Sequence, residues 1–295
     1  MRLLAKTNLT QKYIELLKKS LVDELYIENE ARIVRVANLL FNKQPVSFDD
    51  LYNIGLQKEL LKTLWSVKER GDEIAFNMVQ PDGTSEYVRE MRNFTELAHT
   101  MIGRKRLDNI QYCVETVLED AIPGDLIETG VWRGGACIFM RGLLVAYDVT
   151  DRHIWAADSF EGVPSPTYPE DAGFDISARV LPVLAVPIDQ VRELFNRYGL
   201  LDDQVRFLKG WFKDTLHAAP IDALSVLRLD GDLYESTMDA LRPLYDKVTR
   251  GGFIIVDDYF SCPPCKRAVD EFRAVRGVAA PLQQIDEQSV YWRKT

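Results

Sequence analysis

Histidine and cysteine are scarce in this sequence, with three and four residues of these types among 295. His99, His153 and His217 are isolated, and none belongs to an HExxH or a His-x3-5-His pair. This absence excludes the common histidine-based zinc motifs. If a metal is bound, carboxylate oxygens are its expected ligands, which favours Mg²⁺, Mn²⁺ or Ca²⁺ over zinc.

The cysteines give a similar negative result. Cys113 and Cys137 stand alone, and Cys262-Pro-Pro-Cys265 is a single CxxC pair without the second pair that completes a zinc tetrahedron. The pair is either two incidental loop thiols or a redox or metal pair. The chain also shows no signal peptide and no apolar run of about 18 residues. Together with the few cysteines, these absences predict a cytoplasmic protein that does not enter a membrane.

Positively charged residues are also fewer than negatively charged ones. The chain has 36 Lys and Arg and 45 Asp and Glu, which gives a formal net charge of −9. An acidic chain lacks the broad basic surface that displaces counterions from DNA or RNA, so we expect no nucleic-acid partner. The length suits two domains, or one α/β domain with an appendage.

The N-terminal part of the chain has a helical pattern. From about residue 10 to about residue 118 apolar residues recur at helical spacing, and no convincing strand is evident. Ser47 stands before two aspartates and is the expected N-cap of a helix. The segment Gln80-Pro-Asp-Gly-Thr84 indicates a turn, which predicts two helical segments joined near residues 71–90.

After Pro123-Gly124 the pattern changes to short apolar runs that alternate with helical stretches, which indicates βαβ units around a mostly parallel sheet. The expected strands are residues 125–130, 153–158, 205–208, 223–229 and 252–257, with a closing hairpin at the sheet edge formed by residues 283–285 and 289–292. Polar residues gather at the carboxyl ends of the parallel strands. Open α/β sheets bind their ligands at that edge.

The first candidate site is the turn Glu128-Thr-Gly130-Val-Trp-Arg-Gly-Gly135, between the first strand and a helix. Its glycines permit a tight turn and close approach of a ligand, and free N–H groups at the helix start favour a carboxylate or phosphate. The spacing is not the GxGxxG of dinucleotide sites. Glycines alone fit an ordinary strand-to-helix turn equally well.

The second candidate site is Asp158-Ser159-Phe160, at the end of the second strand. An acid at this position is placed to accept hydrogen bonds from both hydroxyls of a ribose, whether in NAD, FAD or S-adenosylmethionine (SAM). The alternative is a carboxylate that caps the next helix.

The third candidate site is a group of carboxylates. Arg228-Leu-Asp230-Gly-Asp232 ends one strand and Val256-Asp257-Asp258-Tyr259 ends the next. Like charges at such proximity raise each other's pKa unless a cation is present, so the group predicts a divalent metal site. Separate helix caps are the alternative, and a nicotinamide enzyme has no need of this arrangement.

Together these residues resemble the metal-dependent O-methyltransferases of the macrocin and mycinamicin type, the TylF-like family, which methylate sugar hydroxyls of macrolides and related natural products. The segments that carry the resemblance are Asp125-Leu-Ile-Glu-Thr-Gly-Val-Trp-Arg-Gly-Gly-Ala136, Ala157-Asp-Ser-Phe160, Tyr198-Gly-Leu-Leu-Asp-Asp-Gln-Val-Arg-Phe-Leu208, Gly210-Trp-Phe-Lys-Asp-Thr215, Leu229-Asp-Gly-Asp-Leu-Tyr-Glu-Ser-Thr-Met238 and Gly251-Gly-Phe-Ile-Ile-Val-Asp-Asp-Tyr259. It extends upstream through His99-Thr-Met-Ile-Gly103 and Arg106-Leu-Asp-Asn109. Between residues 31 and 92 we recognise no family pattern.

The resemblance implies an α/β fold, the class I SAM-dependent methyltransferase core. This core is a Rossmann-like seven-stranded sheet, mostly parallel with a C-terminal antiparallel hairpin, and it is assigned to residues 119–295. A helical N-terminal lid region is assigned to residues 1–118. Carboxylates matching Asp230, Asp257 and Asp258 are implied to bind Mg²⁺ or Mn²⁺, with Asp230 as the general base.

The resemblance also implies how the cofactor lies. The turn would hold the methionine part of SAM, Asp158 its ribose and residues 210–212 its adenine, while Thr100 and Met101 match a segment that closes over it. The implied cofactor-binding residues are Thr100, Met101, Glu128, Thr129, Gly130, Trp132, Arg133, Gly134, Gly135, Asp158, Ser159, Phe160, Gly210, Trp211, Phe212 and Asp230.

The expected function is therefore Mg²⁺-dependent methyl transfer from SAM to a hydroxyl of a secondary-metabolite intermediate. The acceptor is a sugar hydroxyl or, as the alternative, a hydroxyl of a polyketide, peptide or aromatic intermediate. More remote alternatives are a SAM-binding partner domain without turnover and a nicotinamide-dependent oxidoreductase. We expect a small hydroxylated acceptor, no nucleic-acid or membrane partner, and a homo-oligomer, a dimer or higher.

Overall fold

The computed structural model describes residues 6–53, 58–70, 74–79, 82–83, 85–91 and 97–295. The chain divides into two compact units, the first made of Met1–Glu15 and Lys105–Thr295, the second of Leu16–Arg104. The sequence pattern placed the boundary after residue 118 instead. The difference arises at helix α5 (Arg104–Glu119), which buries Leu107, Ile110 and Val114 and belongs almost entirely to the first unit.

The first unit is built on a seven-stranded sheet with the order β5-β4-β3-β6-β7-β9-β8. Its strands are β3 (Asp125–Thr129), β4 (Ile154–Asp158), β5 (Val205–Lys209), β6 (Leu224–Leu229), β7 (Val248–Val256), β8 (Gln283–Gln284) and β9 (Val290–Arg293). Strands β3 to β7 pair in parallel, and β9 runs antiparallel to both β7 and β8. This confirms the predicted seven-stranded sheet, which is mostly parallel with a closing antiparallel hairpin.

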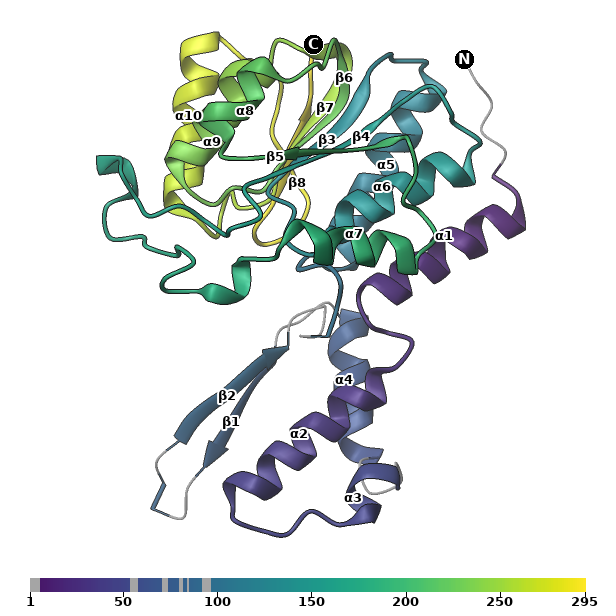
Figure 1. The fold of residues 1–295 in the computed structure, drawn as a ribbon, viewed down its shortest axis with the longest axis vertical. Coiled ribbons are helices and arrows are strands. Elements are labelled where there is room, and N and C mark those ends of the chain that lie inside the picture. Colours follow the sequence, from purple (N-terminus) through teal and green to yellow (C-terminus); the bar gives the residue numbers. More distant parts are fainter. Residues whose placement is uncertain (1–5, 54–57, 71–73, 80–81, 84, 92–96) are drawn as a thin grey trace. The chain divides into compact units, whose positions relative to one another are not determined.

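Helices lie on both faces of this sheet (Figure 1), with α8, α9 and α10 on one face and α5 and α6 on the other. The other helices of this unit are α6 (Gly135–Ala146), α7 (Ile188–Arg197), α8 (Phe212–Thr215), α9 (Tyr234–Leu244) and α10 (Pro263–Arg276), with short 3-10 turns at Pro169–Asp171, Pro182–Leu184 and Leu216–Ala218. Helix α1 (Asn8–Leu21) crosses the boundary between the two units after Glu15. Because both faces are covered, β6 is buried at every residue, including Ser225 and Arg228 within its otherwise apolar sequence. Among the described helices, none has the length and apolarity needed to cross a bilayer.

The second unit contains a β-hairpin, so the expectation of a strand-free N-terminal region is wrong. Strands β1 (Ile74–Val79) and β2 (Ser85–Met91) pair antiparallel. Asp82 and Gly83 lie in the turn between them, Gly83 with a φ of +84°, whereas Gln80, Pro81 and Thr84 lie outside the described residues. The predicted turn is thus present at its centre, but it joins two strands rather than two helical segments.

The helical part of the second unit has its own small core. Its helices are α2 (Ile27–Phe41), α3 (Phe48–Tyr52) and α4 (Lys58–Arg70). Ile27, Ala31 and Leu64 are buried together, and Leu60 and Leu61 pack against them. The apolar spacing that predicted helices here therefore also marks the residues that pack.

Ser47 caps α3 as predicted. Its Oγ accepts a hydrogen bond from the backbone N–H of Asp50, and the Asp50 carboxylate accepts one from the backbone N–H of Ser47 (2.9 Å), which completes a capping box. Asp50 also accepts a hydrogen bond from Arg35 Nε (2.7 Å), which ties α3 to α2. The cap thus satisfies orphan N–H groups and joins two helices.

Replacing Ser47 with alanine should lower the free energy of unfolding by about 1 kcal/mol, because the first turn of α3 loses its hydrogen-bond acceptor. Urea unfolding followed by far-ultraviolet circular dichroism measures the change. Ser47→Thr keeps a hydroxyl at the cap and is the matched control. Equal losses in both variants would assign the effect to something other than the cap.

Candidate active site

The carboxyl ends of β3 to β7, called here the carboxyl edge, are joined by backbone hydrogen bonds where the strands leave the sheet. These bonds run from Gly210 N to Asp158 O, from Gly130 N to Ala157 O, from Asp230 N to Thr129 O and from Asp257 N to Leu229 O, each 2.9 Å long. The loops that follow the strands therefore start from fixed positions on one edge. The three candidate sites named from the sequence meet there.

The turn after β3 requires glycine at position 130. Gly130 has a φ of +91°, and a Cβ built on it would lie 1.7 Å from the backbone oxygen of Asp230. The turn thus passes directly against the strand end that carries the carboxylates. Gly134 is the N-cap of α6 with a φ of +86° and makes no side-chain cap hydrogen bond, so Gly135 begins a helix whose first N–H groups are not capped by its N-cap residue.

Trp132 and Arg133 lie within this turn. Trp132 has a φ of +46°, and its indole N–H donates to the backbone oxygen of Val183 (3.0 Å). The Arg133 guanidinium lies 4.2 Å from the centre of the Trp132 ring. These contacts connect the turn after β3 to the loop that precedes α7.

Asp158 is held in a fixed orientation at the end of β4. Its Oδ2 accepts a hydrogen bond from the backbone N–H of Val131 (2.6 Å) and its Oδ1 accepts one from that of Phe160 (2.6 Å). Burial raises the pKa of Asp158, against the lowering effect of these N–H donors. Because each carboxylate oxygen can accept more than one hydrogen bond, the group retains capacity for a ligand.

The residues next to Asp158 and at the end of β5 are mostly packed. Ser159 and Phe160 are 7% and 5% exposed, and the Ser159 hydroxyl donates to the Gly162 carbonyl (2.8 Å). Trp211 is the half-buried N-cap of α8, and Phe212 packs against the apolar core. Their predicted contact with adenine remains a prediction.

Thr100 and Met101 belong to the second unit. Thr100 is 4% exposed, and its hydroxyl accepts a hydrogen bond from the backbone N–H of Ile102 (3.4 Å). Their predicted role in closing over the cofactor remains a prediction.

Glu128 points away from the turn, into a buried polar network. It is 2% exposed, and its two oxygens accept hydrogen bonds from Arg228 Nη1 (2.6 Å) and Cys137 Sγ (3.0 Å). Burial raises the pKa of Glu128 to about 7, although Arg228 acts in the opposite direction. The structure therefore connects this predicted cofactor residue to the strand that carries Asp230.

Asp230, Asp257 and Asp258 form one group, called here the acid cluster. Each offers a carboxylate oxygen within 4.8 Å of the others. Asp258 is 8% exposed, and within the described residues its buried Oδ2 has no hydrogen-bond partner. Octahedral Mg²⁺ with bonds of about 2.1 Å places its oxygen ligands about 3.0 to 4.2 Å apart. The donor set and the orphaned oxygen fit such an ion.

Two arginines to which the sequence analysis gave no role hold the acid cluster in place. Arg228 is 1% exposed and pairs with Asp230 (2.6 Å), Asp257 and Glu128. Arg106 of α5 binds Asp257 Oδ2 at 2.5 Å. A sequence signal existed for Arg228, since a charged residue inside an otherwise apolar buried strand needs buried partners.

Arg106 is held from the far side by the hairpin that closes the sheet. Its Nε donates to the Asp286 carboxylate at 2.7 Å, and a further nitrogen donates to Gln288 Oε1 at 2.5 Å. The neighbouring Asp257 and Asp286 favour the charged guanidinium and keep the pKa of Arg106 above its ordinary value despite burial. Arg106 is therefore a permanent positive charge beside the acid cluster.

Negative charge still exceeds positive charge at this site. Burial, with the neighbouring Asp230 and Asp257, raises the pKa of Asp232 to about 7. Burial and three nearby carboxylates also raise the pKa of Asp258 well above its usual range. Repulsion of this kind is relieved when a cation binds among the carboxylates.

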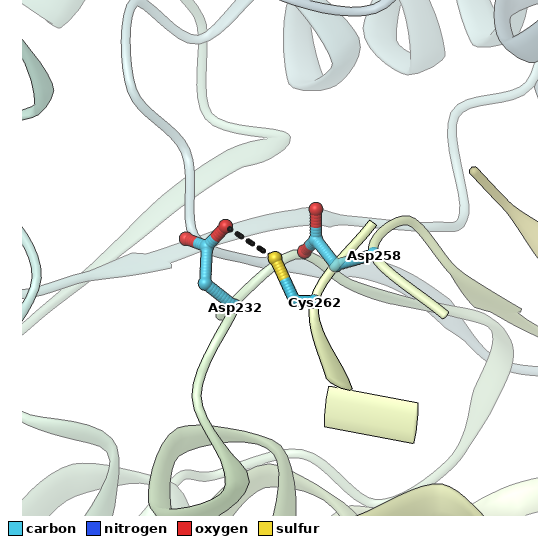
Figure 2. A group of neighbouring side chains, drawn as sticks. All are labelled: Asp232, Asp258 and Cys262. Carbon is cyan, nitrogen blue, oxygen red and sulfur yellow. Dashed lines mark hydrogen bonds between the residues drawn. The ribbon is translucent and has the colours of Figure 1, made fainter. Parts of the chain in front are cut away.

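The structure adds Asp232 and Cys262 to this region (Figure 2). The two side chains face each other with Cys262 Sγ 3.6 Å from Asp232 Oδ1. Asp232 has a φ of +59°, a left-handed backbone conformation that is uncommon outside glycine and is often found at functional sites. The sequence placed Asp232 among the carboxylates but left Cys262 as an unassigned thiol.

This chain is similar to known proteins in sequence and in fold. The family described as Macrocin-O-methyltransferase (TylF) matches residues 10–294, a range that includes residues 31–92, where the sequence analysis recognised no family pattern. Demethyldecarbamoylnovobiocin O-methyltransferase of Streptomyces niveus is 58% identical over 217 residues, which cover 72% of this chain and 83% of the relative.

Two further relatives are close. The 8-demethyl-8-(2,3-dimethoxy-alpha-L-rhamnosyl)-tetracenomycin-C 4'-O-methyltransferase of Streptomyces olivaceus is 56% identical over 207 residues, covering 69% of this chain and 78% of the relative. The solved structure of the O-methyltransferase NovP is 45% identical with a TM-score of 0.74, and the match covers 97% of this chain and 99% of that one.

Proposed function

Because the chain belongs to the Macrocin-O-methyltransferase (TylF) family and is a SAM-dependent O-methyltransferase, we propose that it methylates a sugar hydroxyl of a natural product in a Mg²⁺-dependent reaction. The observation that carries the proposal is the acid cluster of Asp230, Asp257 and Asp258, which lies at the same edge as the glycine turn. Membership of this family excludes the two remote alternatives, a nicotinamide-dependent oxidoreductase and a SAM-binding partner domain without turnover, because the named relatives are methyltransferases.

The proposed acceptor follows from the relatives. One of them is named for the 4'-oxygen of a compound that carries a rhamnosyl group, and it is 56% identical to this chain. A sugar hydroxyl is an alcohol and a poor nucleophile at neutral pH, so it needs a general base and a Lewis acid to activate it. A hydroxyl on a polyketide, peptide or aromatic intermediate is the alternative acceptor and an outcome of the test below.

The proposed cofactor site uses the turn after β3 and the end of β4. The N-terminus of α6 presents backbone N–H groups that favour the carboxylate of SAM. The carboxylate of Asp158, which two backbone N–H groups hold in place, would accept hydrogen bonds from ribose hydroxyls. Both features support the assignment of SAM to this edge of the sheet.

The acid cluster would hold the metal through one oxygen each of Asp230, Asp257 and Asp258. When bound, Mg²⁺ supplies Lewis acidity toward the acceptor hydroxyl, and SAM supplies the methyl group. Arg228 and Arg106 donate hydrogen bonds to the two oxygens of Asp257 and keep its carboxylate in one orientation. These arginines also balance part of the negative charge, so the cluster stays assembled before an ion arrives.

A carboxylate must take the proton of the acceptor hydroxyl as its oxygen attacks the methyl group. The sequence named Asp230 for this role. Asp232 is a second candidate, because Asp230 is paired with Arg228 at 2.6 Å whereas Asp232 forms no ion pair among the described residues. In the described part of the chain, the carboxylate of Asp232 is therefore not shared with an arginine, whereas that of Asp230 is.

Chelation tests the metal part of the proposal. Methyl transfer from SAM is followed by mass spectrometry of the product. The rate should fall to background in EDTA and return when Mg²⁺ or Mn²⁺ is restored, because the acid cluster without a metal ion supplies no Lewis acid. Full activity in the chelator would contradict the metal dependence.

The acceptor is tested with pairs of natural products, each glycoside beside its own aglycone. We expect methylation of the glycosides only, at a sugar oxygen. Methylation of the aglycones would assign the acceptor to the alternative class. Light scattering of the purified chain tests the expected homo-oligomer in the same preparation.

A further inference from the structure

A second group of metal-binding atoms lies beside the acid cluster. Asp232, Asp258 and Cys262 each offer one ligand atom, and all three atoms lie within 4.8 Å of one another. Asp258 and Cys262 are only 8% and 7% exposed. Figure 2 shows the thiol between the two carboxylates. Cys262 is the N-cap of α10, and Asp232 and Asp258 lie in the segments that follow β6 and β7.

The spacing of these atoms suits a tetrahedral ion. Bonds of about 2.3 Å to sulfur and about 2.0 Å to oxygen, at a tetrahedral angle, separate the two ligands by about 3.5 Å. The Cys262 thiol donates a hydrogen bond to Asp232 Oδ1 at 3.6 Å. The two atoms are therefore at a separation that a shared ion would also require, and such an ion would replace the thiol proton between them.

Asp258 also supports a ligand at this position, through the carboxylate that it shares with the acid cluster. Its Oδ2 is buried and without a hydrogen-bond partner within the described residues, and a carboxylate oxygen in that state is costly. The Asp258 carboxylate faces Cys262 in Figure 2. A cation between the thiol and the carboxylates would satisfy this oxygen.

The sulfur atom determines which cation fits. Mg²⁺ takes oxygen ligands, so a thiol beside the acid cluster contributes nothing to a Mg²⁺ site. Thiolate ligands select Zn²⁺ and similar soft ions instead. Cys265, which is also buried, belongs to neither group of metal-binding atoms, so the site has one sulfur and two carboxylates.

We propose that Asp232, Asp258 and Cys262 form a Zn²⁺ site that shares Asp258 with the acid cluster, and that Zn²⁺ bound there inhibits methyl transfer. As the sulfur–zinc bond forms, the Cys262 thiol loses its proton to solvent, and water takes the fourth position on the ion. Binding is a property of the site alone, whereas the inhibition rests on the proposed Mg²⁺-dependent function. Zn²⁺ would inhibit because it engages Asp258 and Asp232 together.

Cadmium is the probe for binding, because a cadmium–thiolate bond adds a charge-transfer band in the ultraviolet. Titration of metal-free protein with Cd²⁺ should produce this band with one equivalent bound, and Cys262→Ser should abolish it. Cys113→Ser is the matched control, since the Cys113 thiol is buried, contacts Asn109 and lies outside both groups of metal-binding atoms. A band that survives in Cys262→Ser, or no band in the unaltered protein, would overturn the site.

Inhibition is measured in a separate experiment, with each protein normalised to its own rate in Mg²⁺ alone. Half-inhibition of Cys262→Ser should need at least about tenfold more Zn²⁺ than the unaltered protein, because the ion loses its sulfur ligand. Equal sensitivity to Zn²⁺ would overturn the inhibitory role.

The two experiments separate this proposal from the proposed function. If no acceptor is methylated, the Cd²⁺ titration still tests the site. If Mg²⁺-dependent methylation is found but Cd²⁺ binding is absent, only the zinc site is wrong. If Cys262→Ser does not fold, Asp232→Asn provides a second variant, in which Cd²⁺ affinity should fall by at least about tenfold.

Discussion

Replacing Asp230 with asparagine should lower the rate of methyl transfer at least about a thousandfold, because one substitution removes a charged metal ligand and a candidate general base. Asparagine preserves the size of the side chain. It cannot accept a proton near neutral pH, and it leaves Arg228 with one carboxylate partner fewer. The rate is measured at saturating SAM and Mg²⁺, with circular dichroism to show that the fold is retained.

The matched control is Asp222→Asn. Asp222 is exposed and precedes β6, whereas Asp230 follows the same strand at its other end. The control should keep its activity, and it should keep the rise in melting temperature that Mg²⁺ produces by binding the folded state. Asp230→Asn should lose both. Activity within tenfold of that of the unaltered protein would show that Asp230 is neither a required metal ligand nor the general base.

The same assay with Asp232→Asn decides between the two candidate bases. Asp232 lies outside the acid cluster, so this variant should still be stabilised by Mg²⁺. If it also loses turnover, Asp232 is the base and Asp230 is a metal ligand. If it retains turnover, the base named from the sequence stands.

Replacing Gly130 with alanine should lower the free energy of unfolding by about 2 to 5 kcal/mol. The left-handed φ of +91° accounts for part of this loss, and the added Cβ would also lie 1.7 Å from the backbone oxygen of Asp230. A backbone oxygen in a buried sheet cannot move aside as the end of a flexible side chain can. The turn or the strand end must shift, so SAM affinity should fall as well.

Gly173→Ala is the control for the conformational part of the effect. Gly173 has a φ of +83°, but a Cβ added there would meet no atom within 4 Å. Its substitution should therefore cost only about 1 to 2 kcal/mol, the strain of the left-handed backbone. Urea unfolding of the two variants gives the comparison, and equal losses would show that the close approach to Asp230 does not matter.

The central strands β3, β4 and β6 were predictable because they are buried on both faces. Strand β6 is buried at every residue and is apolar except for Ser225 and Arg228. The predicted and observed ends of β4 and β6 differ by one residue at most. The hairpin of β1 and β2 was missed because its alternation of Ile74, Phe76 and Met78 is short and stands within a helical pattern.

The amino-acid sequence by itself determined that Asp158, Asp230, Asp257 and Asp258 would meet at one edge. Parallel strands put their carboxyl ends together, so acids that directly follow such strands need no further information to be brought into proximity. The resemblance to the family rests on the same residues, because they lie in continuous segments of sequence at the strand ends.

Only the tertiary structure decided which other side chains reach that edge. Arg106 lies 151 positions before Asp257 along the chain, and Cys262 lies 30 positions after Asp232, yet each pair is in contact. These contacts depend on how α5 and α10 pack against the sheet. Helix packing sets side-chain direction through the combined shape of many residues, and no local pattern of sequence encodes it.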